Sequence, residues 1–307
     1  MRIFFAGTPA TALPSLQALA DQVDVVGVLT RAPAPVGRHH TLTPSAVQEW
    51  AEEHHIPVYT PRTLHEESVQ SLLTSVKPDA VAVVAYGLMI PSELLSVPTF
   101  GWINLHFSLL PRWRGAAPVQ AALASGDTVT GVTTFRIDEG LDTGAVLLQE
   151  QVDIPADADA GTLLRDLSER GADVLVRTLR MLEAGHMTPT PQEGTPTYAH
   201  KVTSKDARID FSRPATDVVN HIRSMTPTPG AWAMYGATRV KLAHAVYGTF
   251  SGDATPDPGA LVGDGRHVWI GTATDPIEIL TVAPAGKKWM AASDWMRGQR
   301  HTMERFQ

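Results

Sequence analysis

The order of hydrophobic and polar positions predicts different elements in the two parts of the chain. Residues 1–7 and 79–85 are almost wholly apolar over the length of a strand, which is typical of parallel strands buried on both faces. Residues 160–184 instead repeat leucine and valine at helical spacing. Because such strands and helices alternate, we predict an α/β domain with a Rossmann-like, mostly parallel sheet and flanking helices. Further strands are predicted at 23–29, 56–59, 102–107, 131–137 and 145–154, the last two antiparallel, and further helices at 10–20, 44–53, 68–75 and 115–124.

The last third of the chain carries shorter apolar segments. After a predicted helix over 215–225, strand-length segments alternate with glycine-rich turns, which is the spacing of a small β-barrel. Residues 188–196 are rich in proline and threonine, as a linker would be. We therefore predict a first domain over 1–188, a linker over 189–204 and a smaller C-terminal β-barrel domain over 205–307. The barrel strands are predicted at 231–235, 239–247, 259–262, 267–272 and 277–282, with a closing helix at 294–300.

Composition narrows the functional classes. The 307 residues include no cysteine, which excludes disulfides, cysteine-ligated zinc and thiolate nucleophiles. No apolar run is long enough to span a bilayer, and the chain enters strand-like sequence at once, so we expect a cytoplasmic protein without membrane contact. The net charge is −7, yet residues 1–198 hold 12 Lys+Arg and 22 Asp+Glu, whereas residues 199–307 hold 13 and 10. A basic C-terminal part hints at nucleic-acid contact, although solvated faces produce the same asymmetry.

The stretch 101–120, GWINLHFSLLPRWRGAAPVQ, holds the first candidate site. If its opening is a strand, Asn104 and His106 project from one face at the carboxyl end, where open α/β sheets bind ligands. An amide and an imidazole there can stabilise the oxyanion that forms when an amine attacks a carbonyl, and can move the proton that the amine loses. The alternative is a buried core histidine beside an asparagine that only closes hydrogen bonds at the strand end.

A second stretch, DEGLDTG at 138–144, offers an acidic partner. Its two glycines allow the loop to fold back tightly, so that Asp142 can meet His106, orient its ring and raise its basicity. An acidic surface turn is the alternative. The turn at 7–9, Gly-Thr-Pro, lacks the three glycines of a dinucleotide fingerprint, so we do not expect NAD binding.

Together, N-L-H-x-S-L-L-P-R-W-R-G and D-E-G-L-D-T-G resemble the folate-dependent formyltransferases, and the likeness runs from M-R-I-F-F-A-G-T-P at the start to about residues 284–298. It is greatest to the branch that formylates the amino group of methionyl initiator tRNA, with 10-formyltetrahydrofolate as cosubstrate and an OB-like C-terminal barrel. The adjacent His39 and His40 could bind a metal, but such a pair in a loop is more often solvated, so we expect no metal. The resemblance implies that Asn104, His106 and Asp142 are catalytic. It also implies a folate site formed by strand-end loops and the acidic loop: Tyr86, Gly87, Ser108, Leu109, Leu110, Pro111 and Asp138.

Contacts with the tRNA are expected in both domains. The content of proline and glycine in segment 31–44 predicts a long irregular loop, and the resemblance implies that this loop reaches the acceptor end of the tRNA through Arg38. The family has Gly-Arg-Gly there, whereas this chain has His39 after Arg38. Arg112 and Arg114 flank a tryptophan and can bind an RNA end or the folate tail, or can hold the loop through carboxylates. The expected tRNA contacts are Arg38, Arg112, Arg114, Lys201, Lys205, Arg208, Lys287 and Lys288.

Other functions are compatible with the same motifs. A formyltransferase acting on an amino sugar nucleotide can carry a comparable C-terminal extension, whereas one acting on glycinamide ribonucleotide resembles only the first domain. Segment 31–44 is the better discriminator between sugar and tRNA substrates. A non-catalytic RNA-binding protein that retains the fold is a further alternative, and the intact set of Asn104, His106 and Asp142 speaks against it. We expect a monomer, because nothing in the sequence indicates an obligate interface.

Overall fold

The computed structural model describes residues 1–36, 40–248, 250, 252, 254–299 and 305–307, so the predicted tRNA contact Arg38 lies outside the described residues. The chain forms two compact units. The first consists of Met1–Gly115, Val129–Asp153 and Leu164–Tyr198, and the second of Ala116–Thr128, Ile154–Leu163 and Ala199–Gln307. The predicted linker 189–204 thus contributes its residues up to Tyr198 to the first unit and the remainder to the second.

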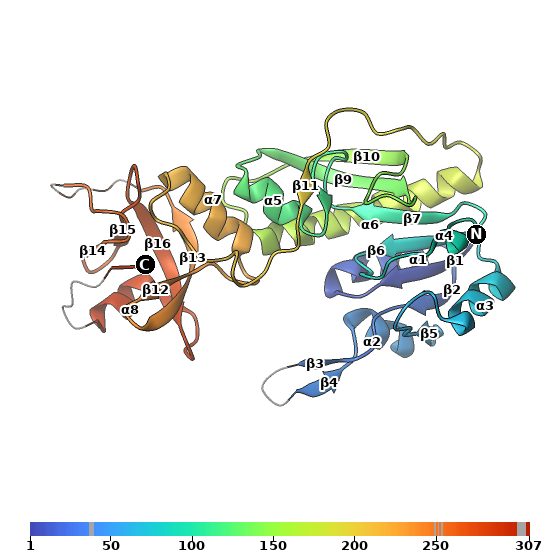
Figure 1. Ribbon diagram of the computed structural model, residues 1–307, viewed down its shortest axis with the longest axis horizontal. Coiled ribbons are helices and arrows are strands. Elements are labelled where there is room, and N and C mark those ends of the chain that lie inside the picture. Colours follow the sequence, from blue (N-terminus) through green and yellow to red (C-terminus); the bar gives the residue numbers. More distant parts are fainter. Residues whose placement is uncertain (37–39, 249, 251, 253, 300–304) are drawn as a thin grey trace. The chain divides into compact units, whose positions relative to one another are not determined.

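The first unit is built on a mostly parallel sheet (Figure 1). Its strands are β1 Arg2–Gly7, β2 Asp24–Leu29, β5 Val58–Tyr59, β6 Ala80–Val84, β7 Trp102–His106, β9 Val129–Arg136 and β10 Val146–Asp153. They lie in the order β10-β9-β7-β6-β1-β2-β5. The pairs from β7 to β5 are parallel, and β9 and β10 add an antiparallel edge. The predicted Rossmann-like fold class is confirmed.

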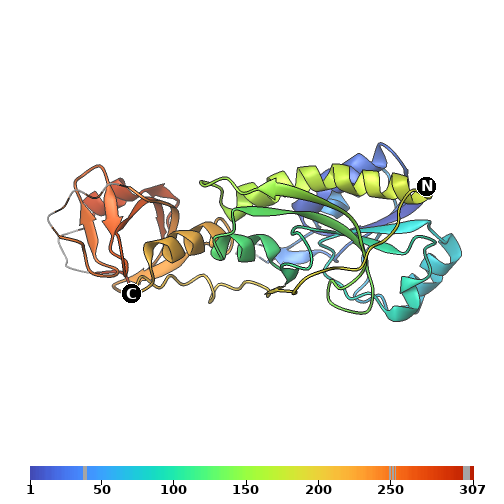
Figure 2. The same cartoon turned by 90° about the horizontal axis from the view of Figure 1, so that it is seen from above.

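Helices cover both faces of this sheet. They are η1 Ala10–Ala12, α1 Leu13–Ala20, α2 Ala46–Glu53, α3 Glu67–Val76, α4 Ser92–Leu95 and α6 Ala160–Glu183. On one face, a buried cluster joins Phe4 and Trp102 to apolar residues of α3 and α4. On the other, α6 runs along the sheet, and Gly171 lies so close to Leu105 that a larger residue would collide with it (Figure 1, Figure 2). Because side chains alternate along a strand, β7 turns Trp102 and every second residue after it toward the first face.

Two local details differ from the sequence expectations. Within segment 31–44, the expectation of an irregular loop was wrong for Ala34–Val36 and Thr41–Thr43, which pair as the antiparallel strands β3 and β4. An isolated ribbon tolerates proline in β3, because each strand leaves one edge unpaired. Helix α2 begins at Ala46 and not at residue 44, and it is capped by Ser45, whose hydroxyl accepts from the Gln48 N–H at 3.0 Å.

The proline-rich connection after α6 is attached to the first unit. Thr190 pairs with Val146 beside β10, with N–O distances of 2.8 and 2.9 Å. Farther along, the Thr197 hydroxyl accepts from the Trp113 N–H at 2.8 Å, and the Thr197 carbonyl accepts from the Arg114 N–H at 2.8 Å. The short strands β8 Arg114–Gly115 and β11 Tyr198–Ala199 pair at this point. The connection therefore runs from the sheet edge to the loop that follows β7.

The second unit contains an antiparallel sheet consistent with the predicted OB-like barrel. Its strands are β12 Trp232–Tyr235, β13 Thr238–Val246, β14 Leu261–Gly263, β15 Val268–Ile270, β16 Ile277–Pro284 and β17 Met290–Ala291, and its helices are α5 Pro118–Ala124, α7 Ala215–Met225 and α8 Ala292–Arg297. The strand order is β12-β13-β16-β15-β14, with β17 beside β16. Helix α5 packs on α7. Near the chain end, Phe306 is buried against the rings of Phe211, Tyr235 and Trp295.

Candidate active site

Strand β7 carries Asn104 and His106 to the carboxyl edge of the sheet. It lies between β6 and β9, where Asn104 is opposite Val83 and Phe135, and His106 is opposite Thr133. Asn104 is half-buried, whereas His106 is buried. An amide and an imidazole thus leave the same face of one strand, at the edge where ligands bind in open α/β sheets.

The acidic loop 138–144, between β9 and β10, is closed by its own side chains. The Asp138 carboxylate accepts a hydrogen bond from the Thr143 hydroxyl at 2.5 Å. Gly144 passes directly against the backbone of Arg136, because a Cβ at this position would lie 1.7 Å from the Arg136 carbonyl oxygen. No residue other than glycine fits there without moving the backbone, so the return of the loop to β10 is tightly defined.

This loop brings Asp142 beside His106. Asp142 has a left-handed backbone conformation, with φ of 51°, and its Oδ2 accepts the Gly115 N–H at 2.7 Å. The same Oδ2 lies 3.8 Å from Nδ1 of His106, and the two side chains are 17% and 6% exposed. The distance is too long for a direct hydrogen bond and short enough for a strong electrostatic interaction.

The protonation of His106 follows from its two neighbours. Nε2 lies 2.9 Å from the Trp113 carbonyl oxygen, and since a carbonyl only accepts, the proton of the neutral ring lies on Nε2. Nδ1 is then an acceptor that faces Asp142. Burial lowers the pKa of His106, while the Asp142 carboxylate and the Trp113 carbonyl oppose this shift. The ring is therefore neutral near pH 7, with a free lone pair on Nδ1.

This arrangement suits general-base chemistry. If Nδ1 accepts a proton, the imidazolium has a hydrogen-bond acceptor at Nε2 in the Trp113 carbonyl and a carboxylate facing Nδ1 in Asp142. Asn104 adds an amide N–H donor from the same strand face. A buried base and a nearby amide donor fit the attack of a neutral amine on a carbonyl.

Two of the predicted folate residues are buried within the loop after β7. The Ser108 hydroxyl donates to the Arg112 carbonyl at 2.6 Å, and the Ser108 carbonyl accepts from the Thr133 hydroxyl at 2.6 Å. The Leu110 carbonyl accepts from the Gln149 side-chain amide at 2.7 Å. These contacts engage the polar groups of Ser108 and Leu110 inside the protein, so both residues shape the loop.

The remaining predicted folate residues are more varied. Leu109 and Pro111 are half-buried, and Gly87 and Asp138 are exposed. Tyr86 is buried, and its hydroxyl has no hydrogen-bond partner among the described residues. Burial raises the pKa of Tyr86 far above its usual value, so the hydroxyl stays protonated and can donate.

Arg112 and Arg114 have different surroundings. The Arg112 side chain is exposed, and its guanidinium carbon lies 4.5 Å from the centre of the Trp113 ring. Arg114 is half-buried and donates to the side-chain oxygen of Gln192 from Nε at 3.1 Å and from Nη2 at 2.6 Å. For Arg114 this matches the loop-holding alternative, with an amide in place of a carboxylate.

The predicted tRNA contacts of the second unit are all exposed: Lys201, Lys205, Arg208, Lys287 and Lys288. Lys287 and Lys288 line a pocket of about 460 Å³ together with Arg239, Lys241 and Trp289, and Trp289 is 46% exposed. Arg239 and Lys241 were not among the predicted tRNA contacts. They alternate with buried aliphatic residues along β13, and that alternation is the signal that reveals a cationic strand face.

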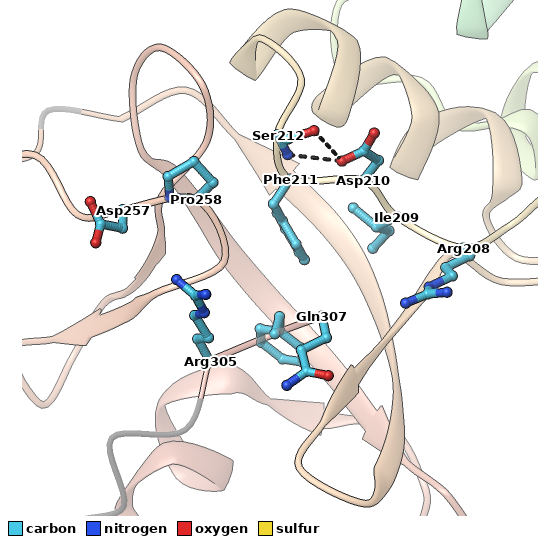
Figure 3. A pocket seen from close by; sticks show the side chains of 10 residues that line it. Arg208, Ile209, Asp210, Phe211, Ser212, Asp257, Pro258, Arg305 and Gln307 are labelled. Carbon is cyan, nitrogen blue, oxygen red and sulfur yellow. Dashed lines mark hydrogen bonds between the residues drawn. The ribbon is translucent and has the colours of Figure 1, made fainter.

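A further cavity of about 660 Å³ lies within the second unit (Figure 3). It is bordered by Phe211, Pro258, Arg208 and Arg305, and the hydroxyl and the backbone N–H of Ser212 donate to an Asp210 carboxylate oxygen at 2.6 and 3.0 Å. None of the Asn104, His106 and Asp142 side chains lines this cavity.

Two features are absent from the described part of the chain. No helix there is long and apolar enough to cross a membrane. Likewise, no group of three or more histidine and acidic side chains among these residues is arranged to hold a metal ion.

Comparison with known proteins identifies the class to which this fold and site belong. The chain is a member of the formyl transferase family: the formyl transferase domain matches residues 1–179, and the formyl transferase C-terminal domain matches residues 201–300. The methionyl-tRNA formyltransferase of Leifsonia xyli subsp. xyli is 48% identical over 298 residues, which is 97% of each chain.

Solved structures show the same fold at low sequence identity. The sugar 3N-formyl transferase WlaRD, crystallised in the presence of dTDP and 5-N-formyl-THF, superposes with a TM-score of 0.69 at 16% identity over 94% of this chain and 99% of that one. The methionyl-tRNA formyltransferase from Clostridium thermocellum superposes with a TM-score of 0.56 at 17% identity over 81% and 94% of the two chains.

Proposed function

We propose that this enzyme transfers the formyl group of 10-formyltetrahydrofolate to the α-amino group of methionyl initiator tRNA. The observation that carries the proposal is the arrangement of Asn104, His106 and Asp142 at the carboxyl edge of the sheet, in a chain nearly half identical to a methionyl-tRNA formyltransferase over almost its whole length. We further propose that the enzyme works in the cytoplasm as a monomer.

The reaction begins when the unprotonated α-amine attacks the formyl carbon. A new C–N bond forms, and the carbonyl electron pair moves to oxygen, where the Asn104 amide donates to the developing oxyanion. The amine proton passes to Nδ1 of His106, and Asp142 stabilises the imidazolium. Collapse of the tetrahedral intermediate breaks the bond to N10 of the folate, and the proton from Nδ1 neutralises that leaving nitrogen. Formylmethionyl-tRNA and tetrahydrofolate are released without a covalent enzyme intermediate.

The folate binds, in this proposal, where the loops after β6 and β7 approach the acidic loop. Tyr86 offers a buried hydroxyl without a partner among the described residues, which suits the polar edge of a heterocycle. Gly87 is exposed beside it, with open space where a Cβ would stand. Ser108 and Leu110 contribute by fixing the loop, because their polar groups already have partners.

The tRNA is bound, in this proposal, by exposed cations of both domains. We assign catalysis to the domain over 1–188 and tRNA binding to the domain over 205–307, connected through 189–204. The pocket beside Lys287 and Lys288 combines cations with an exposed tryptophan, which suits a phosphate backbone and an unstacked base.

A direct assay separates this function from formylation of an amino sugar nucleotide. Purified protein is incubated with 10-formyltetrahydrofolate and methionyl initiator tRNA, and formylmethionyl ester and tetrahydrofolate are quantified. Uncharged initiator tRNA and methionyl elongator tRNA are the controls. Product with the charged initiator alone is the expected result. No product with any tRNA, together with turnover of an amino sugar nucleotide, would overturn the substrate and retain the chemistry.

A further inference from the structure

We propose that Gln192 is a positioning residue for the transfer reaction, acting through the acidic loop on the carboxylate of Asp142. This inference rests on the proposed function. Gln192 lies in the proline- and threonine-rich connection after α6, within the first unit, and it is half-buried. The residue has no place in the sequence motifs that point to the catalytic set.

The side-chain amide of Gln192 is fully used. Its oxygen accepts two hydrogen bonds from the Arg114 guanidinium, at 3.1 and 2.6 Å. Its nitrogen donates to the backbone carbonyls of Asp142 at 2.8 Å and of Gly144 at 2.9 Å. An amide has two N–H donors and an acceptor oxygen, so this clamp satisfies all of them at once. A group bound on both sides in this way has one orientation.

The Gln192 amide binds the acidic loop at Asp142, the residue whose carboxylate faces His106. Asp142 adopts a left-handed backbone, with φ of 51°, a conformation that is uncommon for residues other than glycine. The Gln192 amide binds the carbonyl of this residue, and the Gly115 N–H binds its carboxylate at 2.7 Å. The backbone and the side chain of Asp142 are thus held from two directions, with Oδ2 directed at Nδ1 of His106.

The connection that carries Gln192 is itself anchored on both sides. Thr190 is bound to Val146 at the sheet edge, and Thr197 is bound to the backbone of Trp113 and Arg114. Two residues before Gln192 and five residues after it, the chain is therefore attached to the elements that form the site. This attachment allows a residue remote in sequence to set the position of the Asp142 carboxylate.

The test compares Gln192→Ala and Gln192→Glu with wild type in the formyl-transfer assay. The glutamate keeps an oxygen that can accept from Arg114, but its second oxygen faces the carbonyls of Asp142 and Gly144 and cannot donate to them. Gln192→Glu therefore keeps the contact with Arg114 and removes the hydrogen bonds to the acidic loop. Both variants are expected to lower kcat by about 10–100-fold, the effect of misplacing a catalytic group by about 1 Å. Little change in KM for either substrate is expected. Gln151→Ala, an exposed glutamine on β10, is the matched control and stays at the wild-type rate.

Two readouts separate positioning from a merely structural role. In an Asp142→Asn background, Gln192→Ala should cost less than about twofold, because the carboxylate that it positions is absent. In the wild-type background, Gln192→Ala should also shift the acidic limb of the kcat–pH profile to lower pH. The reason is that displacement of the Asp142 carboxylate removes a negative charge near His106 and so lowers the pKa of that residue. Equal losses in both backgrounds, or wild-type kcat in both Gln192 variants, would overturn the inference. An inactive wild type with every tRNA would instead overturn the proposed function.

Discussion

Replacing Asp142 by asparagine isolates the charge that faces His106. The substitution keeps the shape of the side chain, and the asparagine oxygen can still accept the Gly115 N–H. What disappears is a negative charge 3.8 Å from Nδ1, between side chains that are 17% and 6% exposed. Asp142→Asn is therefore expected to slow the chemical step far more than it destabilises the fold.

The size of the effect follows from the geometry. Two unit charges at this separation interact by about 4 kcal/mol at an effective dielectric constant of about 20. If His106 is fully protonated in the transition state, removing the Asp142 charge lowers kcat by about 10³-fold. If the proton is only partly transferred, the loss is smaller, so the expected range is about 10²–10³-fold. The pKa of His106, which burial already lowers, should fall further without the opposing carboxylate.

The assay measures kcat with both substrates saturating between about pH 4.5 and 9, so that it includes the range below the usual histidine pKa. The substrate amine contributes the same acidic limb in both enzymes, so a difference between the profiles reports His106. Asp153→Asn, an exposed acid at the end of β10, is the control and keeps the wild-type rate and profile. An Asp142→Asn rate within about threefold of wild type would refute the role of the carboxylate.

Three further outcomes are expected. Lys287→Ala and Lys288→Ala should each raise KM for the tRNA and reduce its dependence on salt by about one counterion, with KM for the folate unchanged; an unchanged salt slope would contradict a phosphate contact. His221→Asn should reduce the loss of stability on acidification in urea unfolding at pH 7.5, 6.5 and 5.5. Burial lowers the pKa of His221 in the folded protein, so protonation of this residue favours the unfolded state. The stability that depends on the neutral ring is therefore present above the unfolded pKa of 6.5 and is lost as the pH falls below it, at up to about 1.4 kcal/mol per pH unit. Parallel slopes of unfolding free energy against pH for variant and wild type would contradict this. Phe306→Ala should cost about 3–5 kcal/mol in the same urea assay at pH 7.5, because the ring is only 3% exposed and packs on Tyr235 and Trp295; a loss under about 1 kcal/mol would show that the ring cluster is not part of the core.

Elements that depend on local pattern could be predicted from the sequence. Residues 80–84 are apolar throughout because β6 is covered on both faces, and the apolar spacing of 215–225 is that of α7, Ala215–Met225. The hairpin of β3 and β4 was missed because proline and glycine are poor local indicators of strands, and nothing local shows that an isolated ribbon tolerates them.

The site could be anticipated only where its residues lie in recognisable motifs. Asn104 and His106 share a strand face by the alternation of β7, and the glycines of the acidic loop indicate a tight return. The reason for Gly144 is the Arg136 carbonyl beside it, which no local pattern reveals. Gln192 is a single polar residue in a polar stretch, and its importance follows only from the folded contacts. The catalytic and binding roles assigned to these residues stay predictions.

Helix α5 has a consequence for the modularity of this family. It lies in sequence between strands of the first unit, yet it belongs to the second, where it packs on α7. Its residues Val119, Ala122 and Leu123 are buried. A C-terminal domain cut out at residues 201–300 and grafted onto another formyltransferase would lose this helix and the buried Phe306. A C-terminal domain exchanged between relatives at this border brings its own α7 but meets the α5 of the recipient chain. Only domains whose α7 packs on that α5 can therefore be exchanged.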